Sequence, residues 1–309
     1  MKKIFSLIAM SLISWTAMAA EVIVINSPYS PGHGGHASMM RVLDEANRIQ
    51  KKYNFVQENR PGAQGVIALK HTHDRAQTHL AIIHAAFVDN VEKNLIREED
   101  YVPVHAVGDA CWAVGVLDKN KNLTGVSGMK DMKELVIGTV GLGNVAHLTG
   151  IIIAEQQNIS QRLVLFKSSY DALINLVGGH GVNFVLERPG VLRDFQTRNP
   201  DLHIVGVSCA ERHPEIPTVP TLSEQGVSLP SVFNIVVAHA SMPPERRREI
   251  GAILDQATLA VGKAEIRRMS DFVSPVFGKK ITAQQFYDAR ISAIKKLRAK
   301  YRSELTEGK

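Results

Sequence analysis

Cysteine is scarce in this sequence, with only two among 309 residues. That count excludes a disulfide-dense miniprotein. Aromatic residues are also few, at 6%. Hydrophobic residues nevertheless make up 45% and charged residues 21%, which is ordinary for a globular chain and excludes a disordered or collagen-like one. The length predicts two domains.

A strong excess of one charge sign is missing as well. Lys and Arg outnumber Asp and Glu by 36 to 30, which gives a net charge of +6, and no Lys/Arg-rich patch stands out. Proteins that bind nucleic acid usually carry such a patch. We therefore expect no nucleic-acid partner.

Long apolar runs are absent after the first twenty residues. At the N-terminus, two lysines precede an apolar stretch over residues 4–15, and Ala17-Met18-Ala19 supplies the small-x-small pattern of signal-peptidase sites. The stretch is shorter than the roughly 20 residues that a membrane span requires. We predict a signal peptide over residues 1–20 and a soluble, exported protein.

Export constrains the chemistry. Nicotinamide cofactors and ATP are scarce outside the cytoplasm, and Cys111 and Cys209 would meet an oxidising compartment. Both cysteines lie in β-like stretches. The sequence leaves open whether they form one long-range disulfide or remain two buried thiols.

Strand and helix patterns alternate along the chain, which predicts an α/β fold with mostly parallel sheets. Expected strands cover residues 21–26, 55–57, 79–84, 104–117, 135–139, 163–166, 182–186, 203–208 and 232–238. Apolar residues at helical spacing predict helices around residues 39–49, 145–152, 173–177, 250–261 and 286–297. The last helix ends in the basic residues Lys295, Lys296, Arg298, Lys300 and Arg302, which we expect to form a solvated face.

Two strand–helix units and two long extended crossings predict two domains joined by two hinge strands. The expected domains are residues 21–112 plus 231–309 and residues 113–230. Such a fold has a cleft lined by loops that run from strand ends into helix N-termini. Backbone N–H groups at those termini can bind an anion.

The segment Glu58-Asn59-Arg60-Pro61-Gly62-Ala63-Gln64-Gly65 resembles the ENRPGAGG motif of the periplasmic receptors of tripartite tricarboxylate transporters, the Bug/TctC-type family. Further stretches match that family in the same order. They are Gly141, Gly143 and His147 in its SSGNGTSPH loop, residues 166–169 in its YKGS turn, residues 179–187 in its GGQVDVMFD strand and residues 208–226 in its TSAKRSPALPDVPTVAEAG stretch.

This resemblance implies a two-domain Venus-flytrap receptor without catalytic activity. It would bind a small organic acid through backbone amides and hydroxyls of two facing loops. It would deliver that ligand to the integral membrane subunits of a tripartite tricarboxylate-type transporter. We expect such a receptor to be a monomer.

The sequence departs from the family where ligand contact is expected. The family aspartate of the first loop falls on Ala37 or Ser38, and the Thr-Ser pair of the second loop becomes Asn144-Val145. Glu187 replaces an aspartate and is followed by Arg188. The identity of the ligand therefore does not follow from the resemblance.

Four segments supply the expected ligand-binding residues. They are Tyr29, Gly32, His33, Gly34, Gly35 and His36; Gly141, Gly143, Asn144, Val145 and His147; Ser168 and Ser169; and Glu187 with Arg188. We expect the two first-loop histidines to donate hydrogen bonds to a carboxylate. Arg188 would grip a carboxylate in bidentate fashion while Glu187 orients a donor or an amino group. Each segment also has a purely structural interpretation. The first loop could be a glycine turn, Asn144, Ser168 and Ser169 could be helix caps, and Glu187 with Arg188 could form a surface ion pair.

No metal and no cofactor are expected. His33 and His36 lack a nearby carboxylate or cysteine that would complete a metal site. We expect no metal at the cluster His71, His73 and His79 either, where a surface helix is the alternative. The glycines of residues 141–143 imitate a dinucleotide fingerprint. The acidic residue that this fingerprint requires after the next strand is absent.

Other functions remain open. The sequence has no Gly-x-Ser-x-Gly elbow, but an exported hydrolase that acts on a small carboxylate or ester is a second hypothesis. A ligand-sensing receptor that feeds a signalling partner is another. The Asn59–Gly65 segment argues against an ABC-type receptor.

Overall fold

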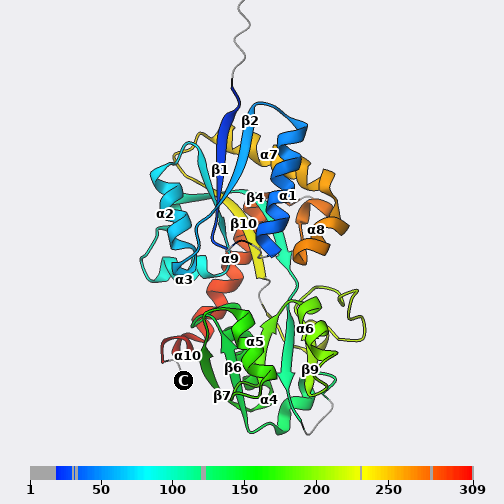
Figure 1. The fold of residues 1–309 in the computed structure, drawn as a ribbon. Coiled ribbons are helices and arrows are strands. Elements are labelled where there is room, and N and C mark those ends of the chain that lie inside the picture. The colour runs from blue at the N-terminus through cyan, green and yellow to red at the C-terminus, as the bar shows by residue number, and fades with distance from the viewer. Residues whose placement is uncertain are drawn as a thin grey trace, which may run out of the picture.

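The computed structural model describes residues 19–29, 31, 34–119, 123–229, 232–278 and 281–307. Almost all of the expected signal peptide lies outside these residues. The described chain forms two α/β lobes, one above the other (Figure 1). We call them the first lobe and the second lobe, after the order in which the chain enters them.

The first lobe surrounds a six-stranded sheet with the order β11-β4-β10-β3-β1-β2. Its strands are β1 (Glu21–Ser27), β2 (Tyr53–Asn59), β3 (His79–Ile83), β4 (Tyr101–Ala110), β10 (Val232–His239) and β11 (Phe272–Val273). Its helices are α1 (Gly34–Ile49), α2 (Val66–Asp74), α3 (Ala86–Glu92), α7 (Pro244–Val261), α8 (Lys263–Ser270) and α9 (Ala283–Lys300).

The second lobe surrounds a five-stranded sheet with the order β7-β6-β8-β5-β9. Its strands are β5 (Ala113–Leu117), β6 (Glu134–Thr139), β7 (Ser160–Leu165), β8 (Phe184–Glu187) and β9 (Leu202–Val207). The helices are α4 (Val145–Gln157), α5 (Ser169–Val177), α6 (Pro189–Gln196) and the C-terminal α10 (Arg302–Glu307). The predicted α/β, two-domain binding-protein architecture is confirmed.

Both sheets are mixed, whereas the sequence predicted mostly parallel ones. Strand β1 pairs in parallel with β2 and β3, and β6 pairs in parallel with β7 and β8. Strands β4, β5, β9, β10 and β11 add only antiparallel pairs. The parallel pairs come from strand–helix–strand units, which need a crossover connection. The antiparallel pairs come from the strands by which the chain leaves and re-enters a lobe.

Each face of the first sheet has its own apolar core. Along β3, Leu80 and Ile82 join the core beneath α1 and α7, whereas Ala81 and Ile83 join the core beneath α2, α3 and α9. Successive side chains of a strand point to opposite faces. A strand buried on both faces therefore appears as a continuous apolar run.

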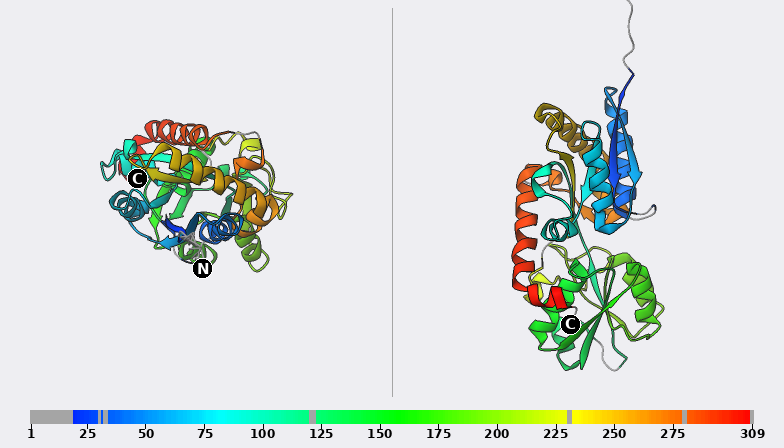
Figure 2. Two further views of the ribbon diagram at one scale, coloured as in Figure 1. Left: turned by 90° about the horizontal axis from the view of Figure 1, so that it is seen from above. Right: turned by 90° about the vertical axis from the view of Figure 1, so that its left-hand side faces the viewer.

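The chain passes between the lobes at three places. The extended stretch 104–117 is two strands in different sheets, separated by Cys111 and Trp112. Strand β10 brings the chain back into the first sheet. Helix α9 then runs along one side of both lobes (Figure 2), and Tyr301 and Leu305 beyond it pack into the core of the second lobe.

This third connection was not foreseen, because the sequence assigned residues 231–309 to the first domain as a whole. Within the described residues, no helix combines the length and the apolar character that crossing a membrane demands.

A disulfide joins Cys111 to Cys209, which are 98 residues apart in the sequence, and leaves no free cysteine in the described chain. Next to it, the Ser208 N–H donates to the Trp112 carbonyl at 2.7 Å, and the Trp112 N–H donates to Ser208 Oγ at 2.9 Å. The bridge therefore fixes the segment where the chain enters the second lobe against the end of β9.

Reducing this disulfide is expected to lower the free energy of unfolding by about 2–5 kcal/mol, because the bridge closes a long loop in the unfolded chain. Denaturant melts with and without reductant measure this loss. The double variant C111A/C209A is the control, since reductant should not change its melt. Titratable thiols in the folded, non-reduced protein would contradict the assignment.

Candidate functional site

The carboxyl ends of six strands meet between the lobes. Strands β1, β2 and β3 are parallel, as are β6, β7 and β8, so the ends within each set lie at one edge of their sheet. The two edges face each other (Figure 1). A Cβ on Gly141, after β6, would lie 3.5 Å from Nε2 of Gln64, which follows β2. We call this region the interlobe site.

Tyr29 lies in the first loop, but its polar groups are occupied. Its hydroxyl donates to Asn234 Oδ1 at 2.6 Å, and its carbonyl accepts from Asn59 Nδ2 at 2.8 Å. Its ring stacks on His84 at 5.9 Å between centroids. Burial raises the pKa of the Tyr29 hydroxyl, which is therefore a neutral donor. Tyr29 thus anchors the start of the loop.

The rest of the first loop leads into α1. Gly32 and His33 lie outside the described residues, and Gly34 and Gly35 are the first residues of α1. His36 Nδ1 lies 2.5 Å from Gln57 Nε2 and 2.8 Å from Asn59 Nδ2. Both contacts are made by Nδ1, so Nε2 is the ring nitrogen without a contact to a described residue. His36 can then donate one hydrogen bond from Nε2.

The second loop is organised by Asn144 at the N-terminus of α4. Asn144 Oδ1 accepts from the His147 N–H at 3.0 Å and from Thr139 Oγ1 at 2.7 Å. The first N–H groups of a helix have no partner within the helix. Since Asn144 caps His147, the N–H groups of Val145 and Ala146 are left without a hydrogen bond to any described residue. These two groups can bind an anion.

Gly143 and His147 hold this loop in place. The Gly143 N–H donates to His147 Nδ1 at 3.0 Å, so that N–H is not free for a ligand. Gly143 has φ +72°, and a Cβ there would lie 2.7 Å from Nη1 of Arg298. Only glycine suits both conditions. This differs from the ligand contact that the sequence suggested for the two residues.

Arg298 links this loop to the first lobe. Its guanidinium donates to the Gly143 carbonyl at 3.2 Å, to Asp89 at 2.6 Å and to Glu92 at 2.9 Å. Its side chain is only 8% exposed. The prediction that this residue lies on a solvated face was therefore wrong, because the end of α9 packs between the lobes.

Ser168 and Ser169 begin α5 at the end of β7. Ser168 Oγ accepts from the Asp171 N–H at 3.0 Å as the helix cap. The N–H groups of Ser169 and Tyr170 are left without a partner among the described residues. Two helices of the second lobe therefore present free N–H groups at the same sheet edge.

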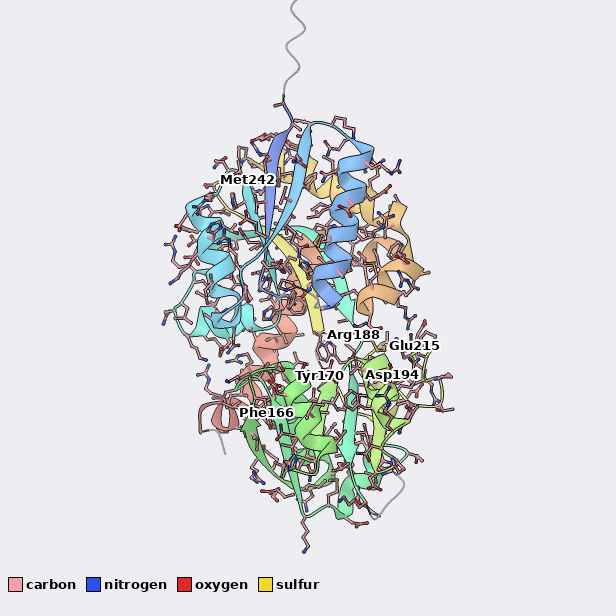
Figure 3. The ribbon with its side chains drawn as sticks, in the orientation of Figure 1. Phe166, Tyr170, Arg188, Asp194, Glu215 and Met242 are labelled. Atoms are coloured by element: carbon pink, nitrogen blue, oxygen red, sulfur yellow. A yellow bond between two sulfur atoms is a disulfide. The ribbon has the colours of Figure 1, made fainter. Side chains whose placement is uncertain are left out.

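Glu187 and Arg188 are engaged with other residues. The Glu187 carboxylate is buried and accepts from the Arg188 N–H at 2.8 Å. Arg188 Nε donates to Asp271 Oδ2 at 2.7 Å, and Figure 3 shows Arg188 at the boundary between the lobes. Burial opposes ionisation of Asp271, but nearby His213 and Arg188 outweigh it and lower the pKa of that carboxyl. Arg188 therefore forms an ion pair between the lobes.

Sequence reasoning missed five residues at this site. They are Gln64, His84, Asn234, Asp271 and Arg298. Gln64 has φ +51°, which is uncommon for a residue other than glycine, and it lies within the family-like segment 58–65. The others come from distant parts of the chain and carry no local signal.

The His147 ring is fully buried, and desolvation lowers its pKa to about 4. Below about pH 6.5 the unfolded chain binds a proton at His147 that the folded protein does not bind. Stability is therefore expected to fall by about 3 kcal/mol between pH 6.5 and pH 4 from this residue alone.

His147→Gln should flatten this part of the stability profile in denaturant melts. His180→Ala, at an exposed histidine, is the control and should keep the wild-type slope. A His147→Gln profile as steep as that of the wild type would contradict the assignment.

Comparisons with known proteins were made against sequences and solved structures. No family model matches the chain. Protein BugT of Bordetella pertussis is 25% identical over 227 residues, which cover 69% of this chain and 67% of that protein. The UPF0065 protein in the tcbD–tcbE intergenic region of Pseudomonas sp. strain P51 is 24% identical over 210 residues, which cover 64% of this chain and 61% of that protein.

Solved structures share the fold over nearly the whole chain. A TctC solute binding protein from Polaromonas has a TM-score of 0.72 at 16% identity and covers 93% of this chain and 99% of its own. MatC of Rhodopseudomonas palustris, solved with bound malate, has a TM-score of 0.67 at 18% identity, with 90% and 98% covered. A second R. palustris protein, solved with adipate, has a TM-score of 0.70 at 18% identity, with 92% and 97% covered.

The sequence relatives and the structural neighbours agree with the motifs read from the chain. The segment 58–65, on which the resemblance was based, begins at the end of β2, and its Gln64 lies against the second loop at Gly141. The chain is similar in sequence to Protein BugT and the UPF0065 protein, and it shares its fold with TctC- and Bug-type periplasmic binding proteins.

Proposed function

We propose that this protein is an exported receptor that binds a small organic acid at the interlobe site. The fold is that of two R. palustris proteins solved with malate and with adipate, both of which are dicarboxylates. At 18% identity the fold alone carries over, so the ligand class must be argued from the site itself.

The observation that carries this proposal is the set of free N–H groups at the starts of α4 and α5. Val145 and Ala146, together with Ser169 and Tyr170, offer four backbone donors at one sheet edge. The positive ends of two helix dipoles point the same way. Such an arrangement favours an anion with several oxygen atoms, and a carboxylate fits it.

Three arginines near the site already have carboxylate partners. Arg188 pairs with Asp271, Arg60 pairs with Glu58, and Arg298 pairs with Asp89 and Glu92. The charge of each of these guanidinium groups is thus already balanced by a carboxylate. We therefore propose that backbone amides and neutral donors bind the ligand, while Arg188 links the two lobes.

The proposed contacts come from both lobes. In the second lobe they are Gly141, Asn144, Val145, Ala146, Ser168, Ser169 and Tyr170. In the first lobe they are His36 through Nε2, Gln64, and the loop residues Gly32, His33, Gly34 and Gly35. Tyr29, Gly143, His147 and Glu187 shape the loops around the ligand. We propose residues 21–112 plus 231–309 and residues 113–230 as the two domains, with α10 docked onto the second.

We further propose that the protein works in the periplasm as a monomer, without a cofactor. It would deliver its ligand to the membrane subunits of a tripartite tricarboxylate-type transporter. A receptor returns its ligand unchanged, whereas a hydrolase does not. At the interlobe site, Ser168 Oγ caps α5 and no hydrogen bond to a histidine is described for it. This supports a receptor over an exported hydrolase.

Val145→Pro tests the central donor. Proline is well tolerated at the first position of a helix and lacks the N–H. Asn144, with φ −74° and ψ 175°, already has the extended backbone that a following proline requires. A hydrogen bond to a charged group contributes about 1.5–3 kcal/mol. Val145→Pro should therefore weaken binding of a responsive dicarboxylate by about tenfold or more.

The ligand for this test comes from a thermal-shift screen with malate, adipate and other organic acids, with the neutral adipamide as a negative control. Val145→Ala is the matched control in calorimetry, because it keeps the N–H and should bind within about threefold of the wild type. If the alanine and proline variants lost the same ligand affinity, or if adipamide bound as tightly as the dicarboxylate, backbone recognition of an anion would be contradicted.

A further inference from the structure

We propose that His73, Asp100 and His239 form a binding site for a divalent zinc-type metal ion. One ligand atom from each of these residues lies within 4.8 Å of the other two. They form the only such group of three or more His, Cys, Asp or Glu side chains among the residues that the structure describes. The site is independent of the interlobe site. Met242, close to His239, is labelled in Figure 3 at the end of the first lobe that points away from the second.

The sheet brings two of the ligands together. His239 ends β10 and pairs with Tyr101, the first residue of β4. Asp100 immediately precedes Tyr101, and its carbonyl accepts from the Ala240 N–H at 2.8 Å. The backbone of both strands is therefore fixed on either side of the proposed metal.

Helix α2 supplies the third ligand from its last turn. His73 Nδ1 lies 4.0 Å from Asp100 Oδ2, and the His73 and His239 rings are nearly perpendicular, with centroids 4.6 Å apart. Ligands around tetrahedral zinc lie about 3–3.5 Å apart. Small side-chain rotations would close the site. The negative end of a helix dipole also favours a cation here.

His239 has the features of a prepared ligand. Its Nε2 is buried and has no hydrogen-bond partner among the described residues. Its Nδ1 lies 2.8 Å from Ser241 Oγ and accepts from the Ser241 N–H at 3.2 Å. Ser241 therefore orients the ring through Nδ1, and Nε2 is the nitrogen left for a metal. With a metal on Nε2 the ring proton would move to Nδ1, where Ser241 Oγ can accept it.

Two imidazoles and one carboxylate are a common protein ligand set for zinc, with a fourth position open to water. Magnesium and calcium prefer oxygen ligands and would bind poorly. Arg97 competes for the same carboxylate, since it donates to Asp100 at 2.5 and 3.1 Å. Its side chain is 70% exposed and can move into water when a metal binds.

The test is calorimetry with zinc chloride on the full chain purified without a histidine tag. We expect one zinc per chain at this site and a higher melting temperature with zinc than with magnesium, since an ion that binds the folded state stabilises it. His73→Ala and His239→Ala should each weaken zinc binding by about tenfold or more. His73 is half-exposed, so His73→Ala carries the test if His239→Ala does not fold.

Two further variants sharpen the result. His180→Ala removes an exposed histidine elsewhere and should leave zinc affinity unchanged. Arg97→Gln removes the competing cation and should tighten binding by about threefold or more. No zinc binding by the wild type, or a His73→Ala variant that binds as the wild type does, would overturn the proposal.

Discussion

The buried guanidinium of Arg298 holds the two lobes and the second loop in one arrangement. It reaches from the end of α9 to Asp89 and Glu92 in the first lobe and to the Gly143 carbonyl in the second. A buried charge is tolerated only when it is paired and hydrogen-bonded. Any change in the spacing of the lobes must therefore preserve these contacts or replace them. Because Gly143 is held by both Arg298 and His147, the start of α4 is fixed before a ligand arrives.

Preorganised donors account for how a site with few free charges can select an anion. Helix N-termini gather at the edge of the second sheet because β6, β7 and β8 are parallel and each leads into a helix. Three nearby arginines, Arg60, Arg188 and Arg298, are paired with Glu58, Asp271 and the Asp89 and Glu92 carboxylates. Neutral donors in fixed positions lose little conformational entropy when a ligand binds. They discriminate between ligands by shape and by the number of ligand oxygen atoms to which they can donate. The Arg188–Asp271 pair crosses between the lobes and contributes to their relative position.

Much of the fold was predictable from local patterns. The alternation of strand and helix patterns over residues 135–187, with the cap at Asn144, predicted the strand–helix units of the second lobe. The family-like segment 58–65 indicated the two-domain architecture. The mixed sheets were not predictable, because strand direction depends on long-range pairing, although the sequence did place a domain boundary after Trp112. Arg298 was misjudged for the same reason: a basic residue in a helix's last turn resembles a surface residue until the second lobe covers it. At the candidate site, local sequence identified the loops but not the partners that occupy Arg188, Tyr29 and His147.

The most direct test of this account is an amide NMR titration of the ¹⁵N-labelled protein with the dicarboxylate that stabilises it most. The account predicts that the amide signals of Val145, Ala146, Ser169 and Tyr170 shift in saturable fashion with a single dissociation constant. The side-chain Nε signal of Arg188 should keep its position, because its pair with Asp271 stays intact. Saturable shifts confined to other regions, with those four amides unmoved, would contradict the claim that helix N-termini between the lobes bind the ligand.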